Sequence, residues 1–128
     1  MKALVLACFT LISAVSFAQN TVADKVASAM AKGDVAGIAT HMVSTVDLAI
    51  LDDENMLPRD QVSDKLKAFF KDHPAQGFEV KHKGKSKLDD HYRIGDLKTS
   101  KGTFRVTYFM KKGANGMKVK QLRIEAYD

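Results

Sequence analysis

Apolar residues recur at intervals of three and four positions in three segments of the chain, and this spacing predicts three helices. The first follows a capping residue at Asn20 or Thr21 and ends at Gly33, where a left-handed residue is favoured. The second runs from Val35 to His41, and the third begins near Pro58. Their apolar faces consist of Val22, Val26, Ala29 and Met30, then Val35, Ile38, Ala39 and Met42, and finally Val62, Leu66, Phe69 and Phe70.

Alternation of apolar and polar residues predicts strands in the rest of the chain. One strand runs over residues 44–50 and is closed by the polar turn Asp52–Asn55. Beyond Gly77 every segment favours strand, with new strands beginning near residues 78, 92, 103 and 117. The last two form a hairpin around the glycine-containing turn at 113–116.

The apolar register shifts within two of these strands, which indicates β-bulges. We expect one bulge at Gly95 and another at Lys120 or Gln121. The strand from residue 78 presents Phe78, Val80 and His82 on one face and Glu79, Lys81 and Lys83 on the other. Lys81, Lys83, Lys85 and Lys87 then form a cationic row, either an ordinary solvated face or a surface for an anionic ligand, lipid head group or glycan.

This order of elements is written ααβαβββ when the segments from residues 78 and 92 are counted together as one strand region. It predicts an α+β domain whose N-terminal helices pack on one face of a curved antiparallel sheet. Several segments resemble a family of small exported proteins of Gram-negative bacteria that is known as a domain of unknown function. They are Phe69-Phe70 with His73-Pro74, and residues 77–84, 92–97, 104–106 and 122–125. That family is similar to the nuclear transport factor 2-like superfamily of cystatin-like cones. The resemblance implies this fold, an exported location and a pocket between sheet and helices, but no activity and no catalytic residue.

The N-terminal segment has the three parts of a secretory signal peptide. Lys2 supplies a positive charge, Ala3–Val15 is an apolar run too short to span a bilayer, and Ser16 and Ala18 form a cleavage site. We expect cleavage after Ala18, which leaves a single domain over residues 19–128 in the periplasm or outside the cell. Cys8, the only cysteine, belongs to this leader, although residues 5–8 also resemble a lipidation motif.

Composition narrows the possible functions. The chain carries 20 basic and 15 acidic residues, and loss of Lys2 with the leader lowers its formal net charge from +5 to +4. The four histidines are scattered and the acidic turns lack calcium-loop spacing, so we predict no metal site. The chain also lacks a dinucleotide fingerprint, a phosphate-binding glycine loop and a nucleophile elbow, so we predict no cofactor. We expect no transmembrane segment in the mature protein and, because of export, no nucleic-acid partner.

Five residues are candidates for polar lining of a pocket: His41, Asp47, Tyr92, Asp96 and Tyr108. Asp47 lies in an apolar strand, where burial would raise its pKa for work as a general base, but alternation also allows it to face solvent. His41 either faces the pocket or complements the C-terminal dipole of the second helix. The tyrosines either line the pocket or belong to the core with their hydroxyls at its edge.

The sheet face away from the helices is the candidate protein interface, because it mixes arginine, amide and aromatic side chains. It contains Arg105, Thr107, Phe109, Gln121 and Arg123. A homodimer or a partner protein of the envelope fits this surface. The sequence therefore predicts a non-catalytic binding or interaction module of the cell envelope. The alternative is a small-molecule pocket protein, with or without an activity of proton transfer or hydrolysis.

Overall fold

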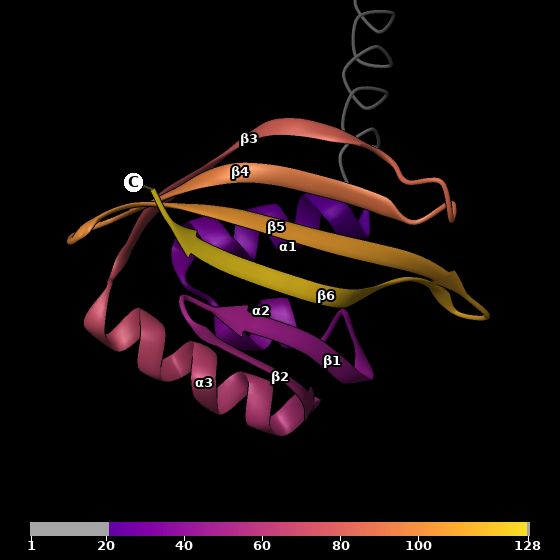
Figure 1. The fold of residues 1–128 in the computed structure, drawn as a ribbon, viewed down its shortest axis with the longest axis horizontal. Coiled ribbons are helices and arrows are strands. Elements are labelled where there is room, and N and C mark those ends of the chain that lie inside the picture. The colour runs from indigo at the N-terminus through magenta and orange to yellow at the C-terminus, as the bar shows by residue number, and fades with distance from the viewer. Residues whose placement is uncertain (1–20, 128) are drawn as a thin grey trace, which may run out of the picture.

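The computed structural model describes residues 21–127, which form three helices and six strands (Figure 1). The signal peptide expected over residues 1–18 lies outside the described residues. The elements are α1 (Val22–Lys32), α2 (Val35–Ala39), β1 (Met42–Ile50), β2 (Asp53–Pro58), α3 (Arg59–Asp72), β3 (Ala75–Lys85), β4 (His91–Thr99), β5 (Gly102–Gly113) and β6 (Gly116–Ala126). The order is thus ααββαββββ, which corrects the predicted ααβαβββ.

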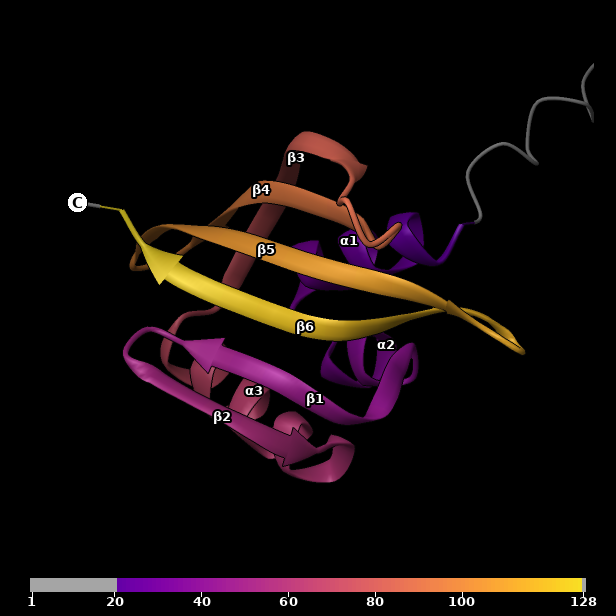
Figure 2. The same ribbon diagram turned by 45° about the vertical axis from the view of Figure 1, so that its right-hand side comes forward.

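The six strands form one sheet in the order β2-β1-β6-β5-β4-β3. All neighbours are antiparallel except β1 and β6, so the sheet is mixed, where an entirely antiparallel sheet was predicted. The parallel pair is possible because α3 and four strands separate β1 from β6 along the chain, which leaves ample length for a crossover. The helices lie on one side of the curved sheet (Figures 1 and 2), which confirms the α+β cone.

Strand β2 was missed because it lacks the alternation that marks a half-buried strand. Every residue of β2 is exposed except the half-buried Leu57. The predicted polar turn at Asp52–Asn55 is shorter in the structure, where Leu51 adopts a left-handed conformation with φ 57° and Asp53 already pairs with Ile50. Strand β2 lies at the edge of the sheet and pairs only with β1, so its polar sequence faces solvent and is tolerated there.

The helix ends follow the capping residues closely. The Thr21 side chain accepts a hydrogen bond from the Asp24 backbone N–H, and Gly33 has a φ of 67° in the left-handed region, as predicted. Helix α2 is shorter than expected, because it ends at Ala39 with Thr40 as its C-cap. His41 therefore lies beyond the helix, directly before β1 begins at Met42.

The hydrophobic core lies between the helices and the sheet. Phe69 of α3 packs edge-on against Phe104 of β5, with ring centroids 5.3 Å apart. Each fully buried side chain of this size contributes roughly 1.5–3 kcal/mol relative to its exposed state. The largest fully buried side chains come from both layers, namely Met30, Ile38 and Leu66 of the helices and Met42, Leu97, Tyr108, Met110, Leu122 and Ile124 of the sheet.

The strand register shifts at several points of the sheet, and one of the two predicted β-bulges lies where it was expected. The pairing changes from Phe109↔Gln121 to Met110↔Val119, which leaves Lys120 as the extra residue and confirms that bulge. The bulge expected at Gly95 lies instead on the neighbouring strand, where Lys81 is the extra residue of β3. Gly95 itself makes room for a ring, because a Cβ there would lie 2.6 Å from Cζ of Phe78.

The bulge at Lys81 changes which residues of β3 face the helices. Before it, Phe78 and Val80 face the helices; after it, His82 pairs with Ile94, which lies on the opposite face, and Lys83 pairs with Arg93. Lys83 and Lys85 therefore turn toward the helix side, contrary to the predicted cationic row on one outer face.

None of the helices within residues 21–127 has the length and apolar character that crossing a membrane requires.

Candidate functional site

Two hairpin turns and the start of α1 meet at one end of the sheet (Figure 1). The β3–β4 turn follows the pair Lys85↔His91, and the β5–β6 turn follows the pair Lys111↔Lys118. Because His91 pairs with Met110, the start of β4 lies beside the end of β5 and both turns extend from the same edge. We call this region the hairpin end, comprising residues 83–91 and 111–120.

A pocket of about 370 Å³ opens at the hairpin end, between the first turn of α1 and the sheet. Its apolar wall includes Val22 and Ala23 of α1 and Met110 and Met117 of the sheet. The volume falls in the range of small-molecule sites, roughly 300–1,000 Å³. The other lining residues are Thr21, Lys83, Gly84, Lys85, His91, Tyr92 and Arg93, so the polar side chains include four basic residues and no carboxylate.

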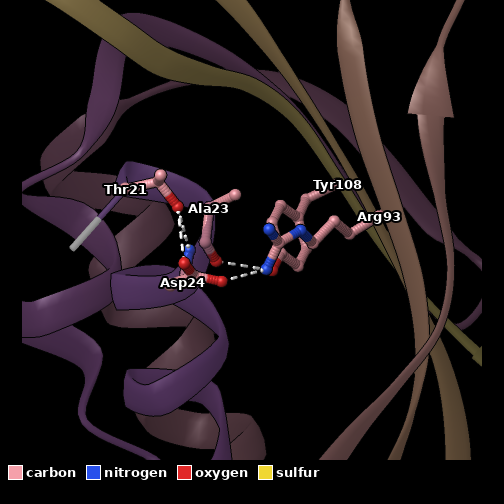
Figure 3. A network of polar contacts seen from close by, with 5 residues as sticks. All are labelled: Thr21, Ala23, Asp24, Arg93 and Tyr108. Atoms are coloured by element: carbon pink, nitrogen blue, oxygen red, sulfur yellow. Dashed lines mark hydrogen bonds and ion pairs between the residues drawn. The ribbon is translucent and has the colours of Figure 1, made fainter. Parts of the chain in front are cut away.

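An ion pair between Arg93 of β4 and Asp24 of α1 joins the sheet to the helix beside the pocket (Figure 3). Nη1 of Arg93 lies 2.6 Å from Oδ1 of Asp24, and the Arg93 side chain is only 14% exposed. The Thr21 hydroxyl donates to Oδ2 of Asp24 at 2.8 Å. These two hydrogen bonds, first that from Arg93 and then that from Thr21, lower the pKa of the Asp24 carboxyl. The pair holds the guanidinium of Arg93 in place beside the pocket.

Tyr108 ties the same turn of α1 to β5 from behind the pocket wall. Its hydroxyl donates to the backbone carbonyl oxygen of Ala23 at 3.0 Å (Figure 3), and its side chain is fully buried. Burial raises the pKa of this phenol to about 12. Tyr108 therefore stays neutral across the physiological pH range and positions α1 against the sheet.

The five predicted pocket residues are spread over several places in the structure. Tyr92 is one of the residues that line the pocket, but it pairs with Phe109, so its ring lies on the opposite face of the sheet. Tyr108 lies behind the pocket wall. Asp47 pairs with Gln121 and Asp96 with Arg105, which places both carboxylates on the sheet face away from the helices. A contact between a ligand and any of the candidate residues outside the pocket remains a prediction.

His41 lies near the hairpin end without lining the pocket. Its imidazole is half-buried, and its backbone carbonyl accepts a hydrogen bond from the Val119 N–H at 2.7 Å. Burial lowers the pKa of His41, and the positive charges of Lys25 and Lys118 lower it further. The neutral imidazole is therefore favoured at this position.

The five predicted interface residues share the sheet face away from the helices, because Arg105, Thr107 and Phe109 alternate with the core residues of β5. Thr107 is itself buried, at 9% exposed, so it offers little surface to a partner. Several of them already have partners within the chain. Arg105 lies over the Tyr127 ring at 5.5 Å, Arg123 bonds Glu54 at 3.2 Å, and the Phe109 ring lies 5.7 Å from that of Tyr92. A protein contact through this face remains a prediction.

Sequence reasoning missed most of the residues that line the pocket. The apolar members were assigned to the core by their periodicity, which is the same for a core residue and for a pocket wall. Lys83 and Lys85 were assigned to the outer face because nothing in the local sequence marks the extra residue at Lys81. Within residues 21–127, no group of three His, Cys, Asp or Glu side chains is placed to hold a metal ion.

Known proteins resemble this chain in sequence and in fold. A family model described as a domain of unknown function (DUF4783) matches residues 23–125, whereas no curated protein matches. A DUF4783 protein of Bacteroides fragilis is 30% identical with a TM-score of 0.76, and the match covers 80% of this chain and 96% of that one.

More distant structures share the fold alone. A protein of Nostoc punctiforme with a cystatin-like fold is 14% identical with a TM-score of 0.64, over 84% of this chain and 74% of that one. A structure described as "Rd1NTF2_04 with long sheet" is 15% identical with a TM-score of 0.61, and the match covers 80% of this chain and 95% of that one. With its matching family model and this shared cone fold, the chain belongs to the DUF4783 family, a group with the nuclear transport factor 2-like, cystatin-like architecture.

Proposed function

We propose that this protein is a non-catalytic binding module of the cell envelope that holds a small amphipathic anion in the pocket at the hairpin end. The observation that carries the proposal is the pocket's composition, an apolar wall bordered by Lys83, Lys85 and Arg93 without any carboxylate. An apolar body would bury its surface against Met110 and Met117, and an anionic group would meet the basic side chains at the rim.

The electrostatics of the pocket favour an anion over a cation or a neutral molecule. Two carboxylates lie beside basic residues of the pocket, and the charge of each is already matched: Asp24 lies 2.6 Å from Arg93, and Asp89 lies 3.5 Å from Lys85. Lys83 makes no ion pair with any described residue, so its charge is available to a ligand. The N-terminal segment predicts export, and in the envelope such a site would meet fatty acids and related amphiphiles.

Calorimetric titration with two probes of the same chain length tests the proposal. Decanoate and decyltrimethylammonium have the same apolar tail and opposite charges, and both are used below their micelle-forming concentrations. We expect decanoate to bind and decyltrimethylammonium to bind at least about tenfold more weakly, a difference of about 1.4 kcal/mol. Equal affinities for the two probes, or no binding of decanoate, would contradict the proposal.

A pair of matched variants locates the binding site on the chain. Ala23→Leu places a larger side chain in the pocket, whereas Ala27→Leu makes the same change one turn further along α1, outside the pocket. Both alanines are half-buried and leucine suits a helix, so both variants should fold. Decanoate binding should be lost in Ala23→Leu and kept in Ala27→Leu, and equal effects would place the ligand elsewhere.

A further inference from the structure

The positive charge of the protein is concentrated at the hairpin end. Residues 83–91 and 111–120 contain seven lysines and only two acidic residues, Asp89 and Asp90. The other described residues carry twelve basic and twelve acidic side chains, so their charges balance. The net charge of the described chain therefore lies at one end. The lysines are Lys83, Lys85, Lys87, Lys111, Lys112, Lys118 and Lys120.

Most of this charge is not neutralised within the chain. Lys85 lies 3.5 Å from Asp89, and Lys120 pairs with Asp90. Among the described residues, the other five lysines of the hairpin end form no ion pair. Lys87, Lys111 and Lys112 are exposed and lie outside the pocket, so they are free to contact an external anionic surface.

An apolar side chain projects from the middle of this charge. Leu88, in the β3–β4 turn, is 82% exposed, the highest value among the large exposed hydrophobic residues. The turn around it is ordered by its own hydrogen bonds, because the Ser86 hydroxyl accepts from the N–H groups of Leu88 and Asp90, each at 3.3 Å. The Ser86 N–H also donates to the Asp90 carbonyl at 2.8 Å. The turn thus fixes Leu88 in an outward position.

We propose that the hairpin end docks on the surface of an anionic phospholipid bilayer, with Leu88 inserted below the head groups and Lys87, Lys111 and Lys112 on the lipid phosphates. An acidic protein or a polysaccharide would match the charge, but neither accounts for an exposed leucine between lysines. A bilayer interface accommodates both, since the apolar tip enters the acyl boundary while the ammonium groups stay among the phosphates. This surface lies outside the pocket, so the inference goes beyond the proposed function.

Docking would also bring the pocket close to the lipid. Thr21 and Val22, at the start of α1, line the pocket together with Lys85, His91 and Met117, which lie next to the two hairpin turns. Figure 2 shows the start of α1 on the same side of the molecule as these turns. A ligand could then exchange between the bilayer and the pocket over a short path. The docking surface and the pocket are tested separately below.

Co-sedimentation with lipid vesicles tests the docking surface. The chain from Gln19 to Asp128 is used, since it contains every residue of the described core and the whole family match over residues 23–125, without the apolar leader. We expect binding to vesicles of phosphatidylglycerol mixed equally with phosphatidylcholine and none to pure phosphatidylcholine. Raising the salt from about 0.05 M to about 0.5 M should release the protein, because the Debye length falls severalfold.

Charge reversal at the hairpin end is compared with the same change at the other end of the sheet. The triple variant Lys87→Glu, Lys111→Glu, Lys112→Glu should lose at least about 100-fold in vesicle affinity, at roughly fivefold for each lysine. The control Lys71→Glu, Lys98→Glu, Lys101→Glu alters the net charge equally but lies near the β4–β5 turn and the end of α3. The control should keep at least part of the vesicle binding that the first variant loses.

The leucine has a matched control of its own. Leu88→Ser should weaken vesicle binding by roughly tenfold, as expected for one inserted apolar side chain. Met56→Ser changes another exposed apolar residue, 63% exposed on β2, and should have no effect. Both positions are on the surface, so circular dichroism should show the native fold in both variants.

Three results would overturn the docking proposal. They are equal binding to neutral and anionic vesicles, equal losses in the two triple variants, and full binding by Leu88→Ser. In the last case, tighter binding to a soluble polyanion such as dextran sulfate would identify an anionic polymer as the partner. Ala23→Leu should bind vesicles normally, so failure of the pocket proposal and failure of the docking proposal give different results.

Discussion

Arg93 of β4 and Asp24 of α1 are separated by 69 positions in the chain, yet Nη1 of Arg93 lies 2.6 Å from Oδ1 of Asp24. This ion pair fixes the first turn of α1 against the sheet, at the place where the pocket opens. Arg93 also lines the pocket, so the same side chain stabilises the fold and contributes charge to the proposed binding site.

Removing the carboxylate should therefore reduce stability in a pH-dependent way. Asp24→Asn should lower the free energy of unfolding by about 1 kcal/mol at neutral pH, in the range of partly exposed ion pairs. Because the pKa of Asp24 is lowered in the folded state, its contribution is complete above the unfolded value of 3.8 and is lost as the pH falls below it. Urea unfolding of both proteins across this range measures the difference.

Asp52→Asn serves as the control for Asp24→Asn. Asp52 is an exposed residue of the β1–β2 turn and forms no ion pair among the described residues. Its substitution should leave the free energy of unfolding within about 0.5 kcal/mol of the wild type. An equal loss in the two variants would show that the Asp24–Arg93 pair has no specific role.

Tyr108 gives a second measurable property of the same region. In the folded protein its pKa is raised to about 12 by burial. The hydrogen bond to Asp96 also raises the pKa of Tyr127, so the spectrophotometric titration is made in a Tyr127→Phe background, where it should show one tyrosine that ionises near pH 12. Tyr108→Phe should remove that component, and Tyr92→Phe should retain it. A late component that persists in Tyr108→Phe would contradict the assignment.

Tyr108→Phe should also change the stability of the protein. It removes the hydrogen bond that the Tyr108 hydroxyl donates to the Ala23 carbonyl, at a cost of about 1–2 kcal/mol. Since the folded pKa lies above the unfolded value of 10.0, the wild-type advantage is fully present below pH 10 and declines as the pH rises toward about 12. Thermal unfolding of both proteins at neutral and alkaline pH measures this change.

Replacing a glycine of the sheet by alanine should lower the free energy of unfolding at Gly95 but not at Gly77. A Cβ at Gly95 would lie 2.5 Å from the Glu79 carbonyl oxygen and 2.6 Å from the Phe78 ring, whereas a Cβ at Gly77 meets nothing within 4 Å. Gly95→Ala should therefore cost about 1–3 kcal/mol through overpacking. Gly77→Ala should be neutral or slightly stabilising, and chemical denaturation of the two variants compares them directly.

The elements that the sequence predicted well are those whose local pattern and burial agree. Helix α1 combines an amphipathic face with a Thr21 cap and a Gly33 terminus, so its boundaries could be predicted nearly to the residue. Strand β2 could not, because it is exposed almost throughout and owes its conformation to pairing with β1.

The candidate site was harder to predict than the fold. The single extra residue at Lys81 turns Lys83 and Lys85 toward the pocket, and the pairing of β3 with β4 decides where that residue lies. The sequence also contains a row of lysines but does not say that the β3–β4 and β5–β6 turns lie at the same end. That proximity follows from the pairing of His91 with Met110.

His41 should report on the charge of the hairpin end. Burial, Lys25 and Lys118 lower the pKa of its imidazole, so its NMR titration should have a midpoint below 6.5. Lys118→Gln removes one of the two positive charges and should move the midpoint upward, whereas Lys101→Gln, near the opposite end of the sheet, should leave it unchanged.

The lowered pKa of His41 also makes the stability of the protein depend on pH. The neutral imidazole contributes stability that is present above pH 6.5 and is lost as the pH falls through the lowered value. His41→Gln should therefore flatten the dependence of unfolding free energy on pH in this window, and an unchanged slope would mean that another group carries it.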